Sequence, residues 1–419
     1  MSEQKKDVAI LVGIAQKSSE FKECEISLDE LERLADTAGA ETYAKVIQVK
    51  ESYDPRTLIG SGKVEEIANL AEASGATLVI FDEELSPAQI RNLETDIGCD
   101  VTVLDRSMLI LDIFALHATS GEGKLQVELA QLKYTAPRLV GKGLALSRQG
   151  GGIGSRGPGE SKLETDRRHL HEKVVALEAR LKELENTKAV MRAQRDRSGL
   201  SKIALVGYTN TGKSTLLNLL TGASVLSEDK LFATLDPTTR KTVLPSGEQI
   251  LLTDTVGFIR KLPHHLIKAF KSTLDEVRYA DILLIVSDIS DPEASEHLAV
   301  TNEVIEELGG SDKPVIYVYN KADACQEIPM SANIADSVIV SAKNGFGIDS
   351  LLEKIDCVIR QSKRRLKLLI PYTEQSLAST LYDEYAVKST EYTEDGIIFD
   401  VVLDARGAGI FKKYVIEQE

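Results

Sequence analysis

This chain of 419 residues lacks the sequence features that would indicate a disulfide-rich, metal-binding, membrane-spanning or secreted protein. Its four cysteines lie far apart and form no C-x-x-C pair, so neither a disulfide framework nor a zinc site is predicted. The six histidines show no metal-ligand spacing. No apolar run approaches the roughly 20 residues that cross a bilayer, and the first residues lack the apolar core of a signal peptide. We therefore expect a cytoplasmic protein, with partial membrane association as the alternative.

The chain has 42% hydrophobic and 27% charged residues, a composition typical of a globular protein. At about 150 residues per domain, the length predicts about two to four domains. The net charge of -15 argues against indiscriminate binding to nucleic acids. A local basic patch is still compatible with an acidic total.

The first hundred residues alternate between apolar and helix-like segments, which predicts a small domain with a parallel sheet. The apolar segments are 8–13, 44–49, 77–81 and 101–104, and the helix-like segments are 27–38, 63–73 and 88–97. Ser27 and Glu30 predict a capping box at the start of the first helix. Residues 58–63, Leu-Ile-Gly-Ser-Gly-Lys, form a glycine-rich turn at a helix N-terminus that could hold a phosphate, or simply start the helix.

Two helical segments, joined by a glycine-rich loop, follow this domain and predict a helical hairpin. The first covers residues 124–134. In the second, apolar residues recur at spacings of three, four and seven, as in a two-stranded coiled coil. These residues are Leu163, Leu170, Val174, Leu177, Leu181, Leu184 and Met191. A short coiled coil by itself indicates no function.

The loop between the two helices, residues 148–159, is basic and rich in glycine. Its neighbourhood contains three acidic residues, Glu160, Glu164 and Asp166, and the basic residues Lys133, Arg138, Lys142, Arg148, Arg156, Lys162, Arg167 and Arg168. Glycines allow close approach to a phosphate backbone, and the cations supply charge-assisted contacts. The loop therefore predicts contact with RNA, with a solvated loop that binds nothing as the alternative.

Residues 207–214 read Gly-Tyr-Thr-Asn-Thr-Gly-Lys-Ser, between an apolar run and a helix-like segment. This is the phosphate-binding loop G-x-x-x-x-G-K-S, in which backbone N–H groups and the helix N-terminus surround phosphate oxygens. Lys213 would reach the β and γ phosphates, and the Ser214 hydroxyl would bind magnesium. A strand further on ends in Asp254-Thr-Val-Gly257, whose aspartate can hold magnesium through water and whose glycine N–H can meet the γ phosphate.

A carboxylate after a later apolar segment indicates the base that is bound. Residues 320–323 read Asn-Lys-Ala-Asp, and guanine, unlike adenine, offers N1–H and N2 donors side by side to a residue such as Asp323. Residues 341–343, Ser-Ala-Lys, would supply a backbone contact to the guanine oxygen. The four motifs in this order predict a GTPase.

The segments that precede the nucleotide motifs resemble one family, the HflX GTPases, which are ribosome-associated P-loop GTPases of the translation-factor-related class. The resemblance spans residues from about 7 to 360 and is carried by residues 58–63, Asp105-Arg106, Ile113-Phe-Ala115, 128–132 and 150–160. It implies binding to the large ribosomal subunit, with the hairpin loop on ribosomal RNA and GTP hydrolysis in the G domain. It further implies a role in splitting or rescuing stalled or idle ribosomes under stress. The C-terminal extension occurs in only some members.

The resemblance also assigns the site. It implies Lys213, Thr234 and Gly257 as catalytic residues and Ser214 and Thr234 as magnesium ligands, with Thr238 and Thr239 competing with Thr234. The residues assigned to nucleotide binding are Gly207, Tyr208, Thr209, Asn210, Thr211, Gly212, Lys213, Ser214, Thr215, Phe232, Ala233, Thr234, Leu235, Asp236, Asp254, Thr255, Val256, Gly257, Asn320, Lys321, Ala322, Asp323, Ser341, Ala342 and Lys343.

Two residues bear on the mechanism of hydrolysis. Phe258 stands where many GTPases place a glutamine that orients the attacking water, and a phenyl ring has no donor or acceptor, so slow intrinsic hydrolysis is expected. Asn210 matches an asparagine that helps hold potassium in several related GTPases. The predicted cofactors are therefore Mg²⁺ with GTP or GDP, and K⁺ as an additional ion. Some relatives are also credited with ATP binding by the N-terminal domain, so a second nucleotide site at Lys63 is a further prediction of the resemblance.

The expected architecture is α/β with four parts. These are an N-terminal parallel-sheet domain (1–105), a helical hairpin with the basic loop (106–198), a doubly wound GTPase domain (199–362) and a small C-terminal α/β domain (363–419). A monomer is expected. Two alternative functions stay open: a GTPase with an ATP-dependent RNA-remodelling N-terminal domain, and a GTPase that acts on protein or membrane partners.

Overall fold

The computed structural model describes residues 7–98, 100–139, 158–196, 200–222, 230–325, 336–362, 364–403 and 405–418. The chain forms two compact units. The first comprises Met1–Leu184, Leu226–Asp236 and Val256–Leu274, and the second comprises Glu185–Val225, Pro237–Thr255 and Asp275–Glu419. No helix among the described residues is long and apolar enough to cross a membrane.

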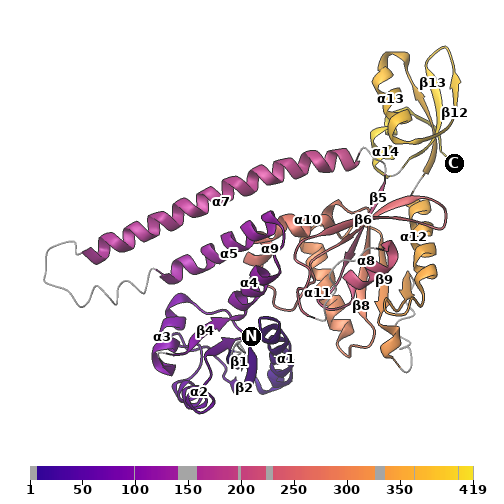
Figure 1. Cartoon of the computed structure of the whole chain (residues 1–419). Coiled ribbons are helices and arrows are strands. Elements are labelled where there is room, and N and C mark those ends of the chain that lie inside the picture. Colours follow the sequence, from indigo (N-terminus) through magenta and orange to yellow (C-terminus); the bar gives the residue numbers. More distant parts are fainter. Residues whose placement is uncertain are drawn as a thin grey trace. The chain divides into compact units, whose positions relative to one another are not determined.

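The first unit begins with a four-stranded parallel sheet in the order β2-β1-β3-β4 (Figure 1). Its strands are β1 (Val8–Ala15), β2 (Glu41–Val49), β3 (Leu78–Phe81) and β4 (Thr102–Asp105). Its helices are α1 (Phe21–Thr37), α2 (Ser61–Ser74), α3 (Pro87–Ile97) and α4 (Arg106–His117). Because helices cover both faces, β1 and β3 are buried and apolar almost throughout. The predicted α/β fold with parallel sheets is confirmed.

The predicted capping box at Ser27 and Glu30 is wrong. Helix α1 already begins at Phe21, and no side chain caps it. Its buried face includes Cys24, which extends the apolar stripe upstream of Ser27. The Ser27 hydroxyl instead donates to Asp82 (2.7 Å), and Glu30 pairs with Arg106. The two polar residues thus belong to an interior network.

A long helix packs beside a shorter one in the first unit. Helix α5 (Gly121–Leu139) is joined to α7 (Pro158–Asp196) by the ion pairs Lys133–Glu178 (2.6 Å) and Lys173–Glu128 (2.7 Å), and Figure 1 shows the two helices side by side. Leu177 is buried, and the other least exposed positions between 167 and 184 are those that the spacing predicted: Leu170, Val174, Leu181 and Leu184. The least exposed side of α7 is therefore the side that the apolar spacing predicted.

The second unit contains a six-stranded sheet in the order β10-β9-β8-β5-β7-β6, parallel except for β6. Its strands are β5 (Ser201–Val206), β6 (Thr238–Val243), β7 (Gln249–Asp254), β8 (Ile282–Asp288), β9 (Val315–Asn320) and β10 (Ser337–Ile339). The helices include α8 (Lys213–Thr221), α11 (Ala294–Glu307) and α12 (Ile348–Ser362), and α8 and α12 share one apolar core with the sheet. Helix α10 (Lys271–Tyr279) bridges the boundary between the units in sequence.

The C-terminal residues form an antiparallel sheet in the order β12-β13-β11-β14, drawn in yellow in Figure 1. The elements are β11 (Arg364–Ile370), α13 (Gln375–Glu384), β12 (Ala386–Tyr392), β13 (Ile397–Leu403), α14 (Ala405–Ile410) and β14 (Val415–Gln418). Leu368, Phe399 and Phe411 are fully buried in its core. This part folds around its own apolar side chains.

A buried charge network lies at the carboxyl ends of β3 and β4 in the first unit. The Arg106 guanidinium, 2% exposed, donates to Asp82 (2.7 Å), to Glu30, and to the Arg260 carbonyl (3.0 Å). The Lys261 ammonium also pairs with Asp82. Burial raises the pKa of Asp82, but the two cations outweigh burial and hold that pKa below its usual value. The network joins α1, the sheet and the segment after Gly257.

Glu83 makes the stability of this unit depend on pH. Burial, followed by the charge of Asp82, raises the pKa of Glu83 to about 7 from 4.5. Because the folded state then holds the proton more tightly than the unfolded chain, the free energy of unfolding should fall as pH rises between these values. Glu83→Gln should remove that loss and stabilise the unit at about pH 8 by up to about 3 kcal/mol, with little effect at about pH 5.

Hydrogen exchange of the β1 and β3 amides at the two pH values measures this difference. Glu84→Gln is the matched control, because Glu84 is adjacent but exposed. Equal protection of parent and Glu83→Gln at both pH values would contradict the assignment.

Candidate functional site

The phosphate-binding loop lies between β5 and α8 in the second unit. Gly207 (φ 150°) and Gly212 (φ 86°) both have backbone angles that side chains disfavour. A Cβ at Gly207 would lie 2.2 Å from the Val286 carbonyl oxygen, and one at Gly212 would lie 2.4 Å from Asn320 Nδ2. The loop therefore passes too close to its neighbours for any residue other than glycine at these two positions.

Lys213 is buried at the start of α8. Its Nζ donates to the carbonyls of Tyr208 (2.6 Å) and Gly207 (3.2 Å), both within the loop. Burial lowers its pKa to about 8, with Asp254 opposing this shift and Lys321 adding to it. An ammonium that is poorly solvated in this way gains from negatively charged phosphate oxygens.

Two hard oxygen ligands meet beside the loop. The Ser214 hydroxyl donates to Asp254 Oδ2 over 2.6 Å, and Asp254 is fully buried at the end of β7. A hydroxyl and a carboxylate are ligands that magnesium prefers, so these residues fit that ion. The adjacent Thr255 is also buried, and its hydroxyl donates to the Leu205 carbonyl (2.7 Å), which ties β7 to β5.

The predicted base-binding residues lie together at the ends of β9 and β10. Asn320 Nδ2 donates to the Thr211 carbonyl (2.8 Å), and Asn320 Oδ1 accepts from the Ala342 N–H (2.9 Å). Asp323 accepts from the Ser341 hydroxyl (2.5 Å), which lowers the pKa of its carboxyl. Asn320 thus connects the phosphate-binding loop to the Ser-Ala-Lys segment, and Asp323 is fixed beside that segment.

Lys321 has a partner that the motif analysis did not identify. Its φ is 65°, and its Nζ pairs with Asp288 Oδ2 over 2.8 Å. Asp288 ends β8, where polar residues at the carboxyl ends of parallel strands often serve a site. In the sequence, the position of Asp288 at the end of an apolar, strand-like segment was the signal that could have identified it.

Thr234 and Gly257 belong to the first unit, with the rest of Phe232–Asp236 and Val256–Gly257. Thr234 is half-buried, and Phe232 and Phe258 are buried. Phe232 contacts Phe114 of α4 edge to face at 4.8 Å between centroids, and Phe114 contacts Phe270 at 4.6 Å. The roles of Thr234 and Gly257 at the nucleotide stay predictions.

Asp236 holds the start of the hairpin helix α5 through Ser120, the residue that caps this helix, and we call this arrangement the Asp236 cap. Its carboxylate accepts from the Thr119 N–H (3.0 Å) and hydroxyl (2.8 Å), and from the Ser120 N–H (2.7 Å) and hydroxyl. Ser120 Oγ in turn accepts from the Gly123 N–H (2.8 Å) in the first turn of the helix. Burial raises the pKa of Asp236, but these hydrogen bonds outweigh it and hold that pKa below its usual value.

A second contact joins α5 to the segment after Gly257. The rings of Tyr134 and His265 stack at 4.9 Å between centroids, and His265 Nδ1 lies 3.5 Å from Glu84 Oε1. His265 is part of the short helix α9 (His264–Ala269).

We call residues 232–236, which carry Thr234, and residues 256–270, which carry Gly257, the two switch segments, because Thr234 and Gly257 are predicted to contact magnesium and the γ phosphate. Both switch segments are attached to the hairpin helix α5 or to the helix before it.

Most of the predicted RNA-contacting residues lie outside the described part of the chain. Lys142, Arg148 and Arg156 belong to residues 140–157, which the structure does not describe. The side chains of Arg138 and Lys162 also lie outside the described part. Of the remaining basic residues, Lys133, Arg167 and Arg168 are exposed or half-exposed on α5 and α7. The RNA contact stays a prediction from sequence.

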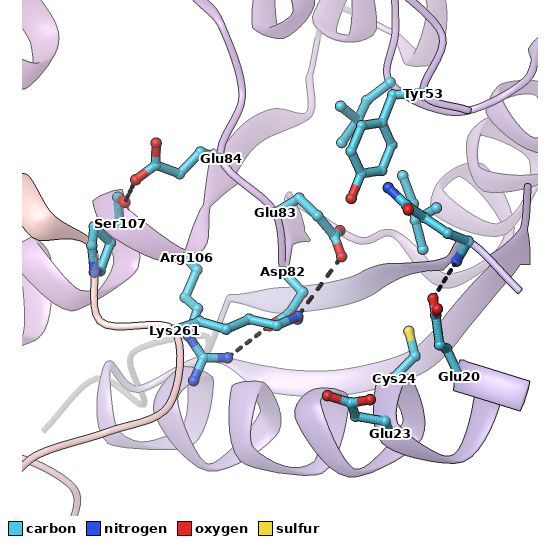
Figure 2. Close-up of a pocket in the computed structure, with 14 residues that line it drawn as sticks. Glu20, Glu23, Cys24, Tyr53, Asp82, Glu83, Glu84, Arg106, Ser107 and Lys261 are labelled. Atoms are coloured by element: carbon cyan, nitrogen blue, oxygen red, sulfur yellow. Dashed lines mark hydrogen bonds and ion pairs between the residues drawn. The ribbon is translucent and has the colours of Figure 1, made fainter. Parts of the chain in front are cut away.

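Figure 2 shows a cavity of about 690 Å³ in the first unit, at the carboxyl ends of β1 and β3. Its lining includes five carboxylates, Glu20, Glu23, Asp82, Glu83 and Glu84, but only two cations, Arg106 and Lys261. This excess of negative charge disfavours phosphates. Lys63 does not line the cavity, and its ammonium pairs with Glu66 (2.6 Å) on α2. ATP binding at Lys63 stays a prediction.

Three family sequence profiles match the chain. They are described as "GTP-binding GTPase N-terminal" (residues 25–115), "GTP-binding GTPase Middle Region" (117–195) and "50S ribosome-binding GTPase" (202–321). A protein of Lacrimispora saccharolytica named "GTPase HflX" is 50% identical over 389 residues, which cover 92% of each chain. The chain belongs to the HflX family of GTPases. Members of this family hydrolyse GTP, and this chain contains the sequence motifs for that reaction.

The chain is also similar to a second relative and to a solved structure. The Escherichia coli "GTPase HflX" is 42% identical over 376 residues, with 88% of each chain aligned. Among solved structures, a GTP-binding protein of Sulfolobus solfataricus in complex with GDP is 26% identical, covering 85% of this chain and 99% of that one, with a TM-score of 0.45.

The Asp236 cap predicts a measurable loss of local order in this HflX protein. Asp236→Asn removes the charge and leaves one carbonyl oxygen where two carboxylate oxygens accept four hydrogen bonds. A hydrogen bond to a charged group contributes about 1.5 kcal/mol, so the amides of Thr119, Ser120 and Gly123 should exchange roughly tenfold faster. Hydrogen exchange measures this, with the exposed Asp395→Asn as control; unchanged exchange in this stretch would argue that Asp236 does not hold the helix.

Proposed function

We propose that this HflX protein is a ribosome-associated factor that binds the large ribosomal subunit through the hairpin and couples that contact to GTP hydrolysis. Its task would be to split or rescue stalled or idle ribosomes, in the cytoplasm. The observation that supports the proposal best is the Asp236 cap, because it attaches a switch segment to the helix that leads into the basic loop. A monomer is sufficient for this arrangement.

Each group of the nucleotide site that the structure describes has a proposed role. Backbone N–H groups of residues 207–212 and the N-terminus of α8 would hold the phosphates, with Lys213 on the β and γ phosphates. Ser214 and, through water, Asp254 would hold magnesium, which neutralises charge that develops on the phosphates. Asp323 would accept from N1–H and N2 of guanine, while Asn320 and Ser341 keep it in place. Thr234 is the proposed second magnesium ligand.

Hydrolysis by the free protein should be slow. Phe258 is fully buried and has no polar atom, so it cannot orient a water molecule. The missing orientation would come from the ribosome or from ordering of the switch segments when the hairpin is bound. Thr234 lies two residues before Asp236, so any movement of the threonine toward the γ phosphate would pull on the cap of α5.

Two other functions remain as alternatives. An ATP-driven N-terminal domain has little support, since the cavity in Figure 2 carries excess negative charge. A GTPase that acts on protein or membrane partners would use the paired helices as a scaffold, but such a scaffold does not require arginines among glycines in its loop.

Stimulation by ribosomal subunits tests the proposal. With the loop from Arg148 to Arg156 replaced by a neutral Gly-Ser linker of equal length, stimulation of GTP hydrolysis by purified large subunits should be lost, because the cations that contact RNA are gone. GTP turnover without subunits should stay the same. A second variant, with the arginines replaced by lysine, keeps the charge and should retain most of the stimulation. If the parent protein shows no stimulation, or if stimulation survives the neutral linker, the proposal that this loop binds the ribosome and stimulates hydrolysis is rejected.

Potassium is the proposed additional ion. Asn210, at φ 58°, stands in the loop at the position that would offer its side-chain oxygen to a potassium ion beside the phosphates. Hydrolysis should then be several-fold faster in potassium chloride than in sodium chloride at equal ionic strength, because the smaller ion fits the same oxygens poorly. Asn210→Ala should abolish the difference. Equal rates of the parent in both salts would remove potassium from the mechanism.

A further inference from the structure

An aromatic pair connects the phosphate-binding loop to α11. The ring of Tyr208, the second residue of the loop, stacks on the imidazole of His297 with 3.8 Å between centroids and 13° between planes. Both residues are buried, and both belong to the second unit. No motif in the sequence indicated His297, because a single histidine on a helix carries no ligand spacing.

The geometry favours the charged form of His297. Two neutral rings prefer offset or edge-to-face contacts, whereas a cation lies well over the face of a tyrosine ring. Each imidazole nitrogen also faces a carboxylate: Nδ1 lies 3.5 Å from Asp291 Oδ2, and Nε2 lies 3.6 Å from Glu293 Oε2. Two negative charges at these distances favour the protonated, positively charged form of the ring through Coulomb attraction.

Tyr208 is hydrogen-bonded to two other residues of the phosphate-binding loop. The Tyr208 carbonyl accepts from Lys213 Nζ (2.6 Å) and from the Thr211 hydroxyl (3.1 Å). A shift of Tyr208 would therefore move Lys213 and the backbone of the loop together. His297 itself is held by α11, where the Thr301 hydroxyl donates to the His297 carbonyl (2.7 Å).

We propose that His297 is a positioning residue for the phosphate-binding loop: its imidazolium, held between Asp291 and Glu293, stacks on Tyr208 and keeps the loop in the conformation that binds nucleotide phosphates. His297 touches no nucleotide in this role. The charged groups that face it in the described structure are Asp291, from the segment after β8, and Glu293, directly before α11. Loss of the proton weakens both the stack and the two ion pairs, so the affinity for GDP falls as pH rises.

Three variants of the full-length chain separate charge from shape, with a fluorescent GDP analogue as the probe. His297→Phe keeps an aromatic ring without the charge, and should bind about tenfold more weakly at about pH 6. His297→Arg keeps a planar cation that can stack, and should recover most of the affinity. Tyr208→Leu removes the ring on which either cation stacks, and should lower the affinity as His297→Phe does.

The dependence on pH gives a readout that a purely structural residue would not change. Between about pH 6 and about pH 8.5, the parent should lose affinity relative to His297→Arg, whose charge does not titrate in this range. Titration of the nucleotide phosphates is common to both proteins and cancels in the ratio. A constant ratio across this range, or a His297→Phe variant that binds like the parent, would overturn the proposal.

A variant that fails to fold does not remove the test. Thermal melts followed by circular dichroism identify such a variant. Glu293→Gln keeps the stacked ring and removes one of the two carboxylates, so the loss of affinity should set in at lower pH than in the parent. An onset at the same pH as in the parent would overturn the proposal.

Discussion

The buried guanidinium of Arg106 is the interaction on which the first unit depends. It binds two carboxylates, Asp82 after β3 and Glu30 on α1, and also the carbonyl of Arg260 in the segment after Gly257. A cation buried in this way is stable only while every partner stays in place, because each carboxylate left alone would carry a large desolvation penalty. The sheet, its first helix and a switch segment are therefore held in one arrangement.

The same segment is fixed by contacts of different chemistry. Lys261 adds a second cation to Asp82, His265 stacks on Tyr134 of the hairpin helix, and Phe270 packs against Phe114. The other switch segment contributes Asp236 and Phe232 to the same part of the molecule. Charge pairs are strong but sensitive to partner loss, whereas ring contacts tolerate small shifts. Both kinds of contact therefore hold the two segments in the first unit.

The sequence predicted the parallel sheets, the seam of α7 and the order of the nucleotide motifs, because each is a local pattern with a fixed period or spacing. It failed for Ser27 and Glu30, where a correct capping pattern lay inside a helix whose apolar stripe began earlier, at Cys24. It could not find Arg106, Asp82 and Lys261 as partners, since these residues are distant in sequence and nothing in their spacing connects them. The same holds for Asp236 with Ser120 and for Tyr208 with His297.

Phe258 is the reason that we expect slow hydrolysis of GTP by the free protein. A fully buried phenyl ring at this position strengthens the packing of the first unit, but it leaves no polar group there to orient water. The phosphate-binding loop, Asp254 and Asp323 are the groups predicted to bind the nucleotide and to recognise guanine, and all are fixed by hydrogen bonds in the described structure. The groups expected to bind GTP are thus present in the chain, whereas no polar side chain at position 258 can orient the attacking water. Under the proposed function, the ribosome supplies that orientation, so binding of GTP and its hydrolysis are controlled by different contacts.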